Sequence, residues 1–147
     1  MTAYFDTGII LKLYTEEPES EAVRAFVIKR GEAIGVSTLH LAECVSALRL
    51  KQFRGEGKAA QVSQAIANLD HDVRSRVLKI FPVDWDEAWR ESRALSDAHA
   101  GVAGCRTLDA LHVACARLLG ARQFISSDRR QGALAKLAGL KLLNPCL

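Results

Sequence analysis

Four acidic residues stand at positions where their side chains could act together. Asp6 directly follows the short apolar run Ala3–Phe5, and Asp128 comes soon after another run of strand length. Glu43 and Asp109 lie near the starts of two helical segments. In a parallel α/β sheet, strands end and the following helices begin at one edge, which is where such sheets bind ligands. We therefore expect the four carboxylates to converge on one cleft.

Such a cluster of acids has a clear chemical use. Carboxylates held close together repel one another and raise one another's pKa values unless a cation lies among them. Ligands that are all oxygen favour a hard cation such as Mg²⁺ or Mn²⁺. A divalent ion of this kind polarises a phosphate, lowers the pKa of an attacking water and stabilises the leaving oxygen. The four acids therefore indicate metal-assisted phosphoryl chemistry.

Each acid also has a purely structural interpretation. Asp6 and Asp128 are suited to cap the helices that follow them. Asp109 would complement the dipole of its helix, and Glu43 would be an ordinary solvated helix residue. These alternatives remain open for each residue taken singly.

The tripeptide Asp6-Thr7-Gly8 also matches the loop of an aspartic protease. Such enzymes are all-β proteins that bring two of these loops together, so that two carboxylates share one proton. A homodimer could supply the second loop, but the segment from Ile9 to Tyr14 has a helical pattern. An aspartyl-phosphate phosphatase is a further alternative, but it would typically need a second Asp at position 8, which is Gly.

The elements that must position these acids alternate along the chain. Short apolar runs of strand length are separated by longer segments with a helical hydrophobic period. Helices between such runs imply right-handed crossovers and a central parallel sheet of about five strands, so the predicted fold is a three-layer α/β domain. The predicted strands are Ala3–Phe5, Ile34–Ser37, Val77–Val83, Gln123–Ser126 and Lys141–Leu143.

Residues that start and stop helices place the segments between the strands. Pro18 fits the first position of a helix that Gly31 ends. The segment from Thr38 to about Asp72 holds two helical patterns around Arg54-Gly55-Glu56-Gly57, which predicts a helical hairpin inserted after the second strand. Two later helices are predicted over Leu108–Leu119, with Thr107 as a possible cap, and over Arg129–Ala138.

Composition places few further limits on function. The 147 residues fit one domain spanning residues 1–147, and the formal net charge of +3 permits contact with a nucleic-acid backbone without arguing for it. No apolar run could span a bilayer, and early acidic residues do not suit a secretory signal, so we expect a cytoplasmic protein. The four cysteines form no CxxC pair and are expected to be buried thiols. Zinc held by the pairs His40/Cys44 and His112/Cys115 is an alternative.

Four segments together resemble the PIN-domain nucleases, and most closely the VapC-type toxins of toxin–antitoxin pairs. "YFDTGIILKLYTEEPES" is similar to the family's opening strand and first acid, and "VSTLHLAECVSALRL" to its second acidic motif. "CRTLDALHVACARLLGA" is the most specific match, and "FISSDRRQGALAKLAGL" is similar to the closing motif. Order and spacing agree over nearly the whole chain, so the resemblance implies a single PIN domain.

The resemblance also implies roles for individual residues. Asp6, Glu43, Asp109 and Asp128 fall on the family's catalytic, metal-binding acids, and the first and third of these would hold Mg²⁺ or Mn²⁺ most directly. Two hydroxyl residues are expected to support the site: Thr7, and Ser126 at a position that is often Thr in the family. Gly8 is a departure, because the family commonly has Ser there, and its absence could alter metal affinity or activity.

The activity that this resemblance implies is that of a metal-dependent endoribonuclease acting on structured RNA, such as tRNA or rRNA. Such a protein is expected to form a homodimer and to be silenced by a cognate antitoxin that covers the acidic cleft. Arg129, Arg130, Lys12 and Arg106 are candidates for holding the RNA backbone. A PIN nuclease with a housekeeping role in RNA maturation, or a weakly active or inactive PIN protein that binds or regulates a partner, are the alternatives.

Overall fold

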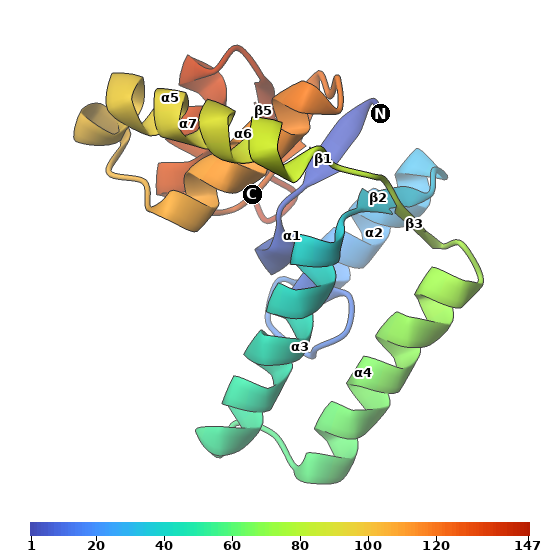
Figure 1. Ribbon diagram of the computed structural model, residues 1–147. Helices are drawn as coiled ribbons and strands as arrows, with labels where there is room; N and C mark the ends of the chain where they lie inside the picture. Colours follow the sequence, from blue (N-terminus) through green and yellow to red (C-terminus); the bar gives the residue numbers. More distant parts are fainter.

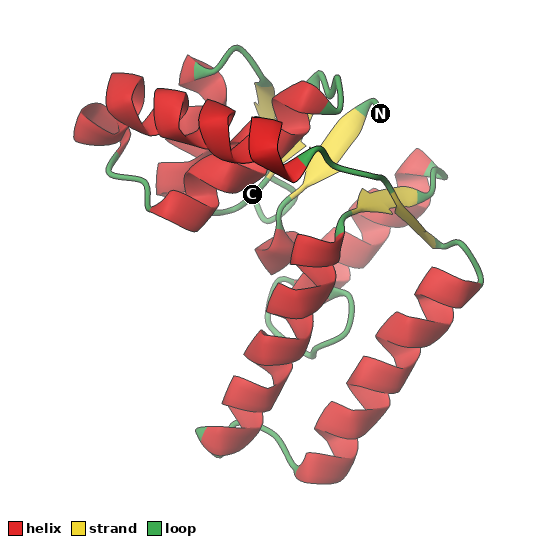
Figure 2. Ribbon diagram, viewed as in Figure 1, coloured by secondary structure: helices red, strands yellow, loops and turns green.

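The computed structural model describes all 147 residues, in which five strands alternate with seven helices (Figures 1 and 2). The strands are β1 Ala3–Phe5, β2 Ile34–Val36, β3 Leu78–Ile80, β4 Gln123–Ile125 and β5 Lys141–Leu143. The helices are α1 Thr7–Lys12, α2 Ser20–Arg30, α3 Thr38–Phe53, α4 Ala59–Arg74, α5 Trp85–Ala103, α6 Thr107–Leu118 and α7 Arg129–Leu137. No helix is both long enough and apolar enough to cross a bilayer.

All strand pairs are parallel, as predicted, but the strands form two hydrogen-bonded groups rather than one continuous sheet. One group has the order β1-β4-β5, with Tyr4 beside Phe124, and the other pairs β2 with β3. Strands β1 and β2 lie in contact without a hydrogen-bonded ladder between them. At this seam the carbonyl of Phe5 accepts a hydrogen bond from Nε2 of His40, at 2.8 Å, in place of a backbone partner on β2.

Two hydrophobic cores lie on opposite faces of the strands, which confirms the three-layer arrangement. Successive strand residues point to opposite faces, so Tyr4 packs in the core beneath α5, α6 and α7, while Phe5 packs in the core shared with α2, α3 and α4. On β4, Phe124 and Ile125 divide between the two cores in the same way. Strands β1, β2 and β4 are therefore buried on both faces, as is usual in parallel sheets, whereas β3 and β5 are partly exposed.

Helices α3 and α4 form the predicted hairpin between β2 and β3, and Figure 1 shows it as an arm that projects from the rest of the molecule. Leu48 of α3 packs against Val62 and Ala65 of α4 in a small core of its own. Tyr14, from the loop after α1, packs against this core and donates a hydrogen bond to Asp72 at 2.6 Å. These contacts hold the hairpin against the segment that follows the first acid.

Three predicted boundaries were wrong for local reasons. Pro18 lies in a turn, and α2 begins only at Ser20. The hydroxyl of Ser20 holds this turn, because it accepts from the amide of Glu17 and donates to the carbonyl of Thr15. Strand β3 is shorter than Val77–Val83, since Pro82 has no N–H to continue a ladder. The cap of α6 is Arg106 rather than Thr107.

Candidate active site

Asp6 is a buried carboxylate at the carboxyl end of β1. It caps α1, because Oδ1 accepts from the amide of Ile9 at 2.7 Å, and Oδ2 accepts from the hydroxyl of Ser126. Only 5% of the residue is exposed. Burial raises the pKa of the Asp6 carboxyl above its ordinary value, and the hydrogen bonds from Ser126 and Ile9 offset this effect only in part. The negative charge of an ionised Asp6 is therefore only partly compensated by its surroundings.

Ser126 connects Asp6 to the fourth predicted acid. Its hydroxyl, which donates to Asp6, also accepts from the backbone amide of Asp128 at 3.0 Å. The side chain of Asp128 is exposed and caps α7 by accepting from the amide of Gln131 at 2.8 Å. The capping interpretation of Asp128 is therefore confirmed, and its backbone amide is linked to Asp6 through the hydroxyl of Ser126.

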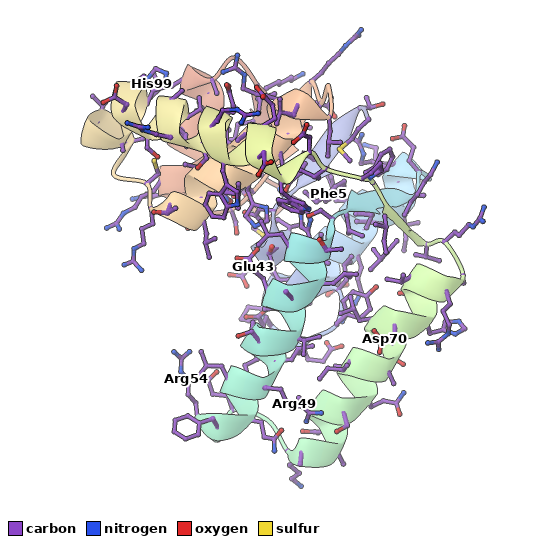
Figure 3. All side chains as sticks on the ribbon, in the orientation of Figure 1. Phe5, Glu43, Arg49, Arg54, Asp70 and His99 are labelled. Carbon is purple, nitrogen blue, oxygen red and sulfur yellow. The ribbon has the colours of Figure 1, made fainter.

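Glu43 lies at the centre of a chain of hydrogen bonds that joins distant segments. Its Oε1 accepts from the hydroxyl of Thr7 at 2.7 Å and is bonded to Nε2 of His112. The other ring nitrogen of His112, Nδ1, is 2.7 Å from the hydroxyl of Tyr4. Burial alone would raise the pKa of Glu43, but the contacts with His112 and Thr7 lower it below its usual value. Glu43 is thus held as a carboxylate, near the start of α3 where the hairpin joins the rest of the molecule (Figure 3).

His40 fixes the start of α3 against β1. Nδ1 accepts from the amide of Ser37 at 2.9 Å, so the proton is on Nε2, which donates to the carbonyl of Phe5 at 2.8 Å. The ring is fully buried and lies 4.9 Å from the ring of His112. Because both nitrogens of His40 are engaged, they offer no free lone pair to a metal, which argues against the zinc interpretation.

Asp109 occupies the first turn of α6, as predicted, and is partly exposed. Its Oδ2 accepts from the backbone amide of Arg106 at 2.9 Å. It lies three residues before His112, so the two side chains are on the same side of the helix. The structure therefore joins Glu43, Thr7 and His112 in one hydrogen-bonded network. Asp6, held by Ser126 and Ile9, and Asp109, held by Arg106, make no hydrogen bond to that network.

The donor atoms of the four acids suit a hard divalent cation, since all are carboxylate oxygens. Buried Asp6 in particular has two oxygens and no cationic partner within hydrogen-bonding distance. As arranged, no three His, Cys, Asp or Glu side chains are grouped closely enough to hold a metal ion together. The four-acid metal site stays a prediction, supported by the chemistry of the donors and by the burial of Asp6.

The four basic candidates lie free of ion pairs. Arg106, Arg129 and Arg130 are exposed, Lys12 is partly buried, and none of them forms a salt bridge. Arg129 also borders a cleft of about 480 Å³ whose lining includes Ser126, Asp128 and Lys136. Unpaired cations beside an acidic site are suited to hold a polyanion near it.

Comparisons with known proteins identify the family and the fold. A family model of the PIN domain matches residues 3–138. The chain belongs to the PIN-domain family. It is 31% identical over 146 residues to Ribonuclease VapC46 of Mycobacterium tuberculosis, a match that covers 97% of this chain and 96% of that protein. The crystal structure of FitAcB from Neisseria gonorrhoeae has the same fold, with a TM-score of 0.67, 16% identity and 98% of both chains covered.

Three residues of this PIN domain were not assigned to the acidic site from the sequence: Tyr4, and His40 and His112, which were considered only as zinc ligands. One signal was present: His112 follows Asp109 by three residues in the motif that resembled the family most closely. Nothing local indicates that its ring would meet a tyrosine 108 residues earlier in the chain. Gly8 is exposed, and a Cβ there would be 3.5 Å from Oδ1 of Asp6, so the Ser expected there from the family resemblance would fit.

Buried His40 is expected to make the stability of this PIN domain depend on pH. Burial and the neighbouring His112 lower the pKa of His40 to about 3, whereas an unfolded histidine titrates near about 6.5. Between these values the unfolded chain binds more protons, so the stability that neutral His40 contributes is complete above about pH 6.5 and is lost as pH falls toward 3.

The variant His40→Gln removes this titration. We expect its free energy of unfolding to fall less than that of the wild type between pH 7 and pH 5, by about 2 kcal/mol. Urea unfolding at both pH values measures the difference. The same fall in both proteins would show that His40 takes up its proton in the folded state as readily as in the unfolded state.

Proposed function

We propose that this protein is a Mg²⁺- or Mn²⁺-dependent endoribonuclease that hydrolyses phosphodiester bonds in structured RNA, either tRNA or rRNA. The observation that carries the proposal is the buried Asp6 carboxylate, whose pKa is raised by burial, next in the chain to Thr7, which donates to the ionised Glu43. The similarity to Ribonuclease VapC46 over nearly the whole chain supports the same reaction class.

The residues of the site would have different roles in this reaction. Asp6 and Asp109 would hold the ion most directly, with Glu43 and Asp128 completing the acidic set. The bound ion would supply a polarised phosphate and an acidified attacking water. Ser126 and the amide of Ile9 keep the Asp6 carboxylate oriented, and Thr7 does the same for Glu43 at 2.7 Å. The carboxylates are therefore already oriented when the substrate binds, so these side chains need not reorganise during the reaction.

Cleavage of RNA is expected to depend entirely on an added divalent ion. The purified protein incubated with tRNA or rRNA should cut in Mg²⁺ or Mn²⁺, lose at least about 100-fold of its rate in excess EDTA, and recover when the ion is restored. Preparations of Asp109→Asn, purified identically, control for contaminating nucleases. Cleavage that persists in EDTA, or is equal in Asp109→Asn, would exclude a metal-dependent nuclease.

Arg129 and Arg130 are proposed to contact the RNA backbone. Replacing both with Ala should weaken RNA binding at low salt and reduce the slope of log affinity against log salt by about 0.7 to 0.9 for each phosphate that is no longer neutralised. Arg54→Ala is the matched control, because Figure 3 places this exposed arginine at the tip of the hairpin, away from Glu43. An unchanged salt slope in the double variant would remove both residues from the interface.

We propose further that the protein acts in the cytoplasm as the toxin of a toxin–antitoxin pair, as a homodimer silenced by a cognate antitoxin. The VapC-type resemblance supports this role. Expression of the wild type alone should arrest growth, and expression of Asp6→Ala at the same level should not. Equal growth in the two cultures would favour an RNA-processing role over a toxin.

A further inference from the structure

The seam between β1 and β2 is bridged by side chains from four separate elements. No backbone ladder joins the two strands. Instead, α3 contacts β1 through His40 and the carbonyl of Phe5, and it contacts the start of α1 through Glu43 and Thr7. Helix α6 reaches the same place through His112. The position of Glu43 relative to Asp6 is therefore set by side-chain hydrogen bonds rather than by a continuous sheet.

The two oxygens of Glu43 have different surroundings. Oε1 is engaged by both Thr7 and His112. Oε2 accepts no hydrogen bond from the protein, and 26% of the side chain is exposed. One oxygen therefore holds the carboxylate in place, which leaves the other for a water or a cation at the site.

The ring of His112 is itself held by a hydrogen bond on the side away from Glu43. A neutral His112 that donates Nε2–H to Glu43 must accept at Nδ1, and the hydroxyl of Tyr4 supplies that proton at 2.7 Å. Tyr4 is fully buried and stacks on Phe124, with ring centroids 5.5 Å apart and planes 12° apart. Both the tyrosine and the histidine are buried, so the anchor of Glu43 extends into the core under α6.

We propose that His112, held by Tyr4, is a positioning residue that fixes Glu43 through Oε1 so that Oε2 is presented to the reacting water or the metal ion. This inference rests on the proposed nuclease function of the acids. A free glutamate loses up to about 2 kcal/mol of rotamer entropy when it is fixed, and His112 removes that cost before binding. Residues that orient a metal ligand from behind typically change metal affinity or activity by about 10- to 100-fold when removed.

Two substitutions at position 112 separate positioning from simple core filling. His112→Gln keeps an N–H that can reach Glu43, whereas His112→Leu fills the space without a donor. We expect His112→Leu to bind Mn²⁺ about 10- to 100-fold more weakly by calorimetry and to lose kcat by a similar factor, with KM for RNA unchanged. His112→Gln should recover most of both. Wild-type Mn²⁺ affinity and kcat in His112→Leu, or an equal loss in both variants, would overturn the inference.

Tyr4→Phe keeps the proposal testable if His112→Leu does not fold. It removes one hydroxyl and preserves the stacked ring, so we expect weaker Mn²⁺ binding than in the wild type, by about three- to tenfold, without a change in KM. Unchanged Mn²⁺ binding would show that His112 needs no anchor. Wild-type protein that neither binds Mn²⁺ nor cuts RNA would instead contradict the proposed function, so the two failures are distinguishable.

Discussion

Asp6→Asn is expected to lower the rate of RNA cleavage by about 10²- to 10³-fold while leaving the protein at least as stable as the wild type at pH 7. The loss of rate has the size found when one group that stabilises charge in a transition state is removed. The stability follows from burial. A carboxyl whose pKa is raised by folding favours the folded state when protonated and opposes it when ionised, so its contribution falls as pH rises from the unfolded value through the folded one.

The asparagine removes this unfavourable ionisation and keeps the helix cap, because Asn caps a helix as well as Asp does. Its carbonyl can still accept from the amide of Ile9, and the hydroxyl of Ser126 can turn toward Oε1 of Gln131, at 3.4 Å. RNA cleavage and urea unfolding measure the two effects on the same preparation. Millimolar Mn²⁺ should raise the melting temperature of the wild type more than that of the variant, because only the wild type carries the uncompensated carboxylate.

Asp84→Asn is the matched control for this experiment. Asp84 caps α5 in the same way, accepting from the amide of Glu87 at 3.1 Å, but it is exposed and makes no contact with the site. We expect its activity to equal that of the wild type and its stability to change by less than about 0.5 kcal/mol. A strongly destabilised Asp6→Asn with an unaffected Asp84→Asn would mean that ionised Asp6 stabilises the fold, contrary to the expectation from its burial.

Phe124→Ala is expected to cost about 3–5 kcal/mol of folding free energy, which is the largest stability effect we predict. Phe124 is fully buried on β4, the middle strand of its group, and it belongs to the core beneath α5, α6 and α7. Removal of the ring leaves a cavity, and the side chains around it lie on several different elements, which cannot all move inward to fill it. Urea unfolding at pH 7 measures the loss.

Phe53→Ala provides the same exchange at a site where no core is lost. Phe53 ends α3 and is 87% exposed, so its removal should change stability by less than about 0.5 kcal/mol. Equal effects of the two substitutions would show that the core assigned to β4 is not well packed. Because Phe124 supports Tyr4, Phe124→Ala should also weaken Mn²⁺ binding in any fraction that remains folded.

The positions of the four acids show how much of the site local sequence patterns can predict. Asp6 and Asp128 were predicted where strands end, and both cap the helix that follows. Asp109 and Glu43 were predicted near helix starts, and both lie there. Each of these placements depends on the period of apolar residues and on capping within a few positions, which are properties of short segments of chain. The sequence by itself therefore determined the order of elements, the α/β class and the edge at which the acids lie.

The tertiary structure alone decided how those acids are held. The bond between Tyr4 and His112 joins residues 108 positions apart, and that between Ser126 and Asp6 joins residues 120 positions apart. The division of the strands at the seam and the burial that raises the pKa of Asp6 are likewise products of packing between distant segments. A local pattern specifies which face of an element is apolar. A buried polar group must have a hydrogen-bond partner, but which residue provides it depends on how all the elements pack together.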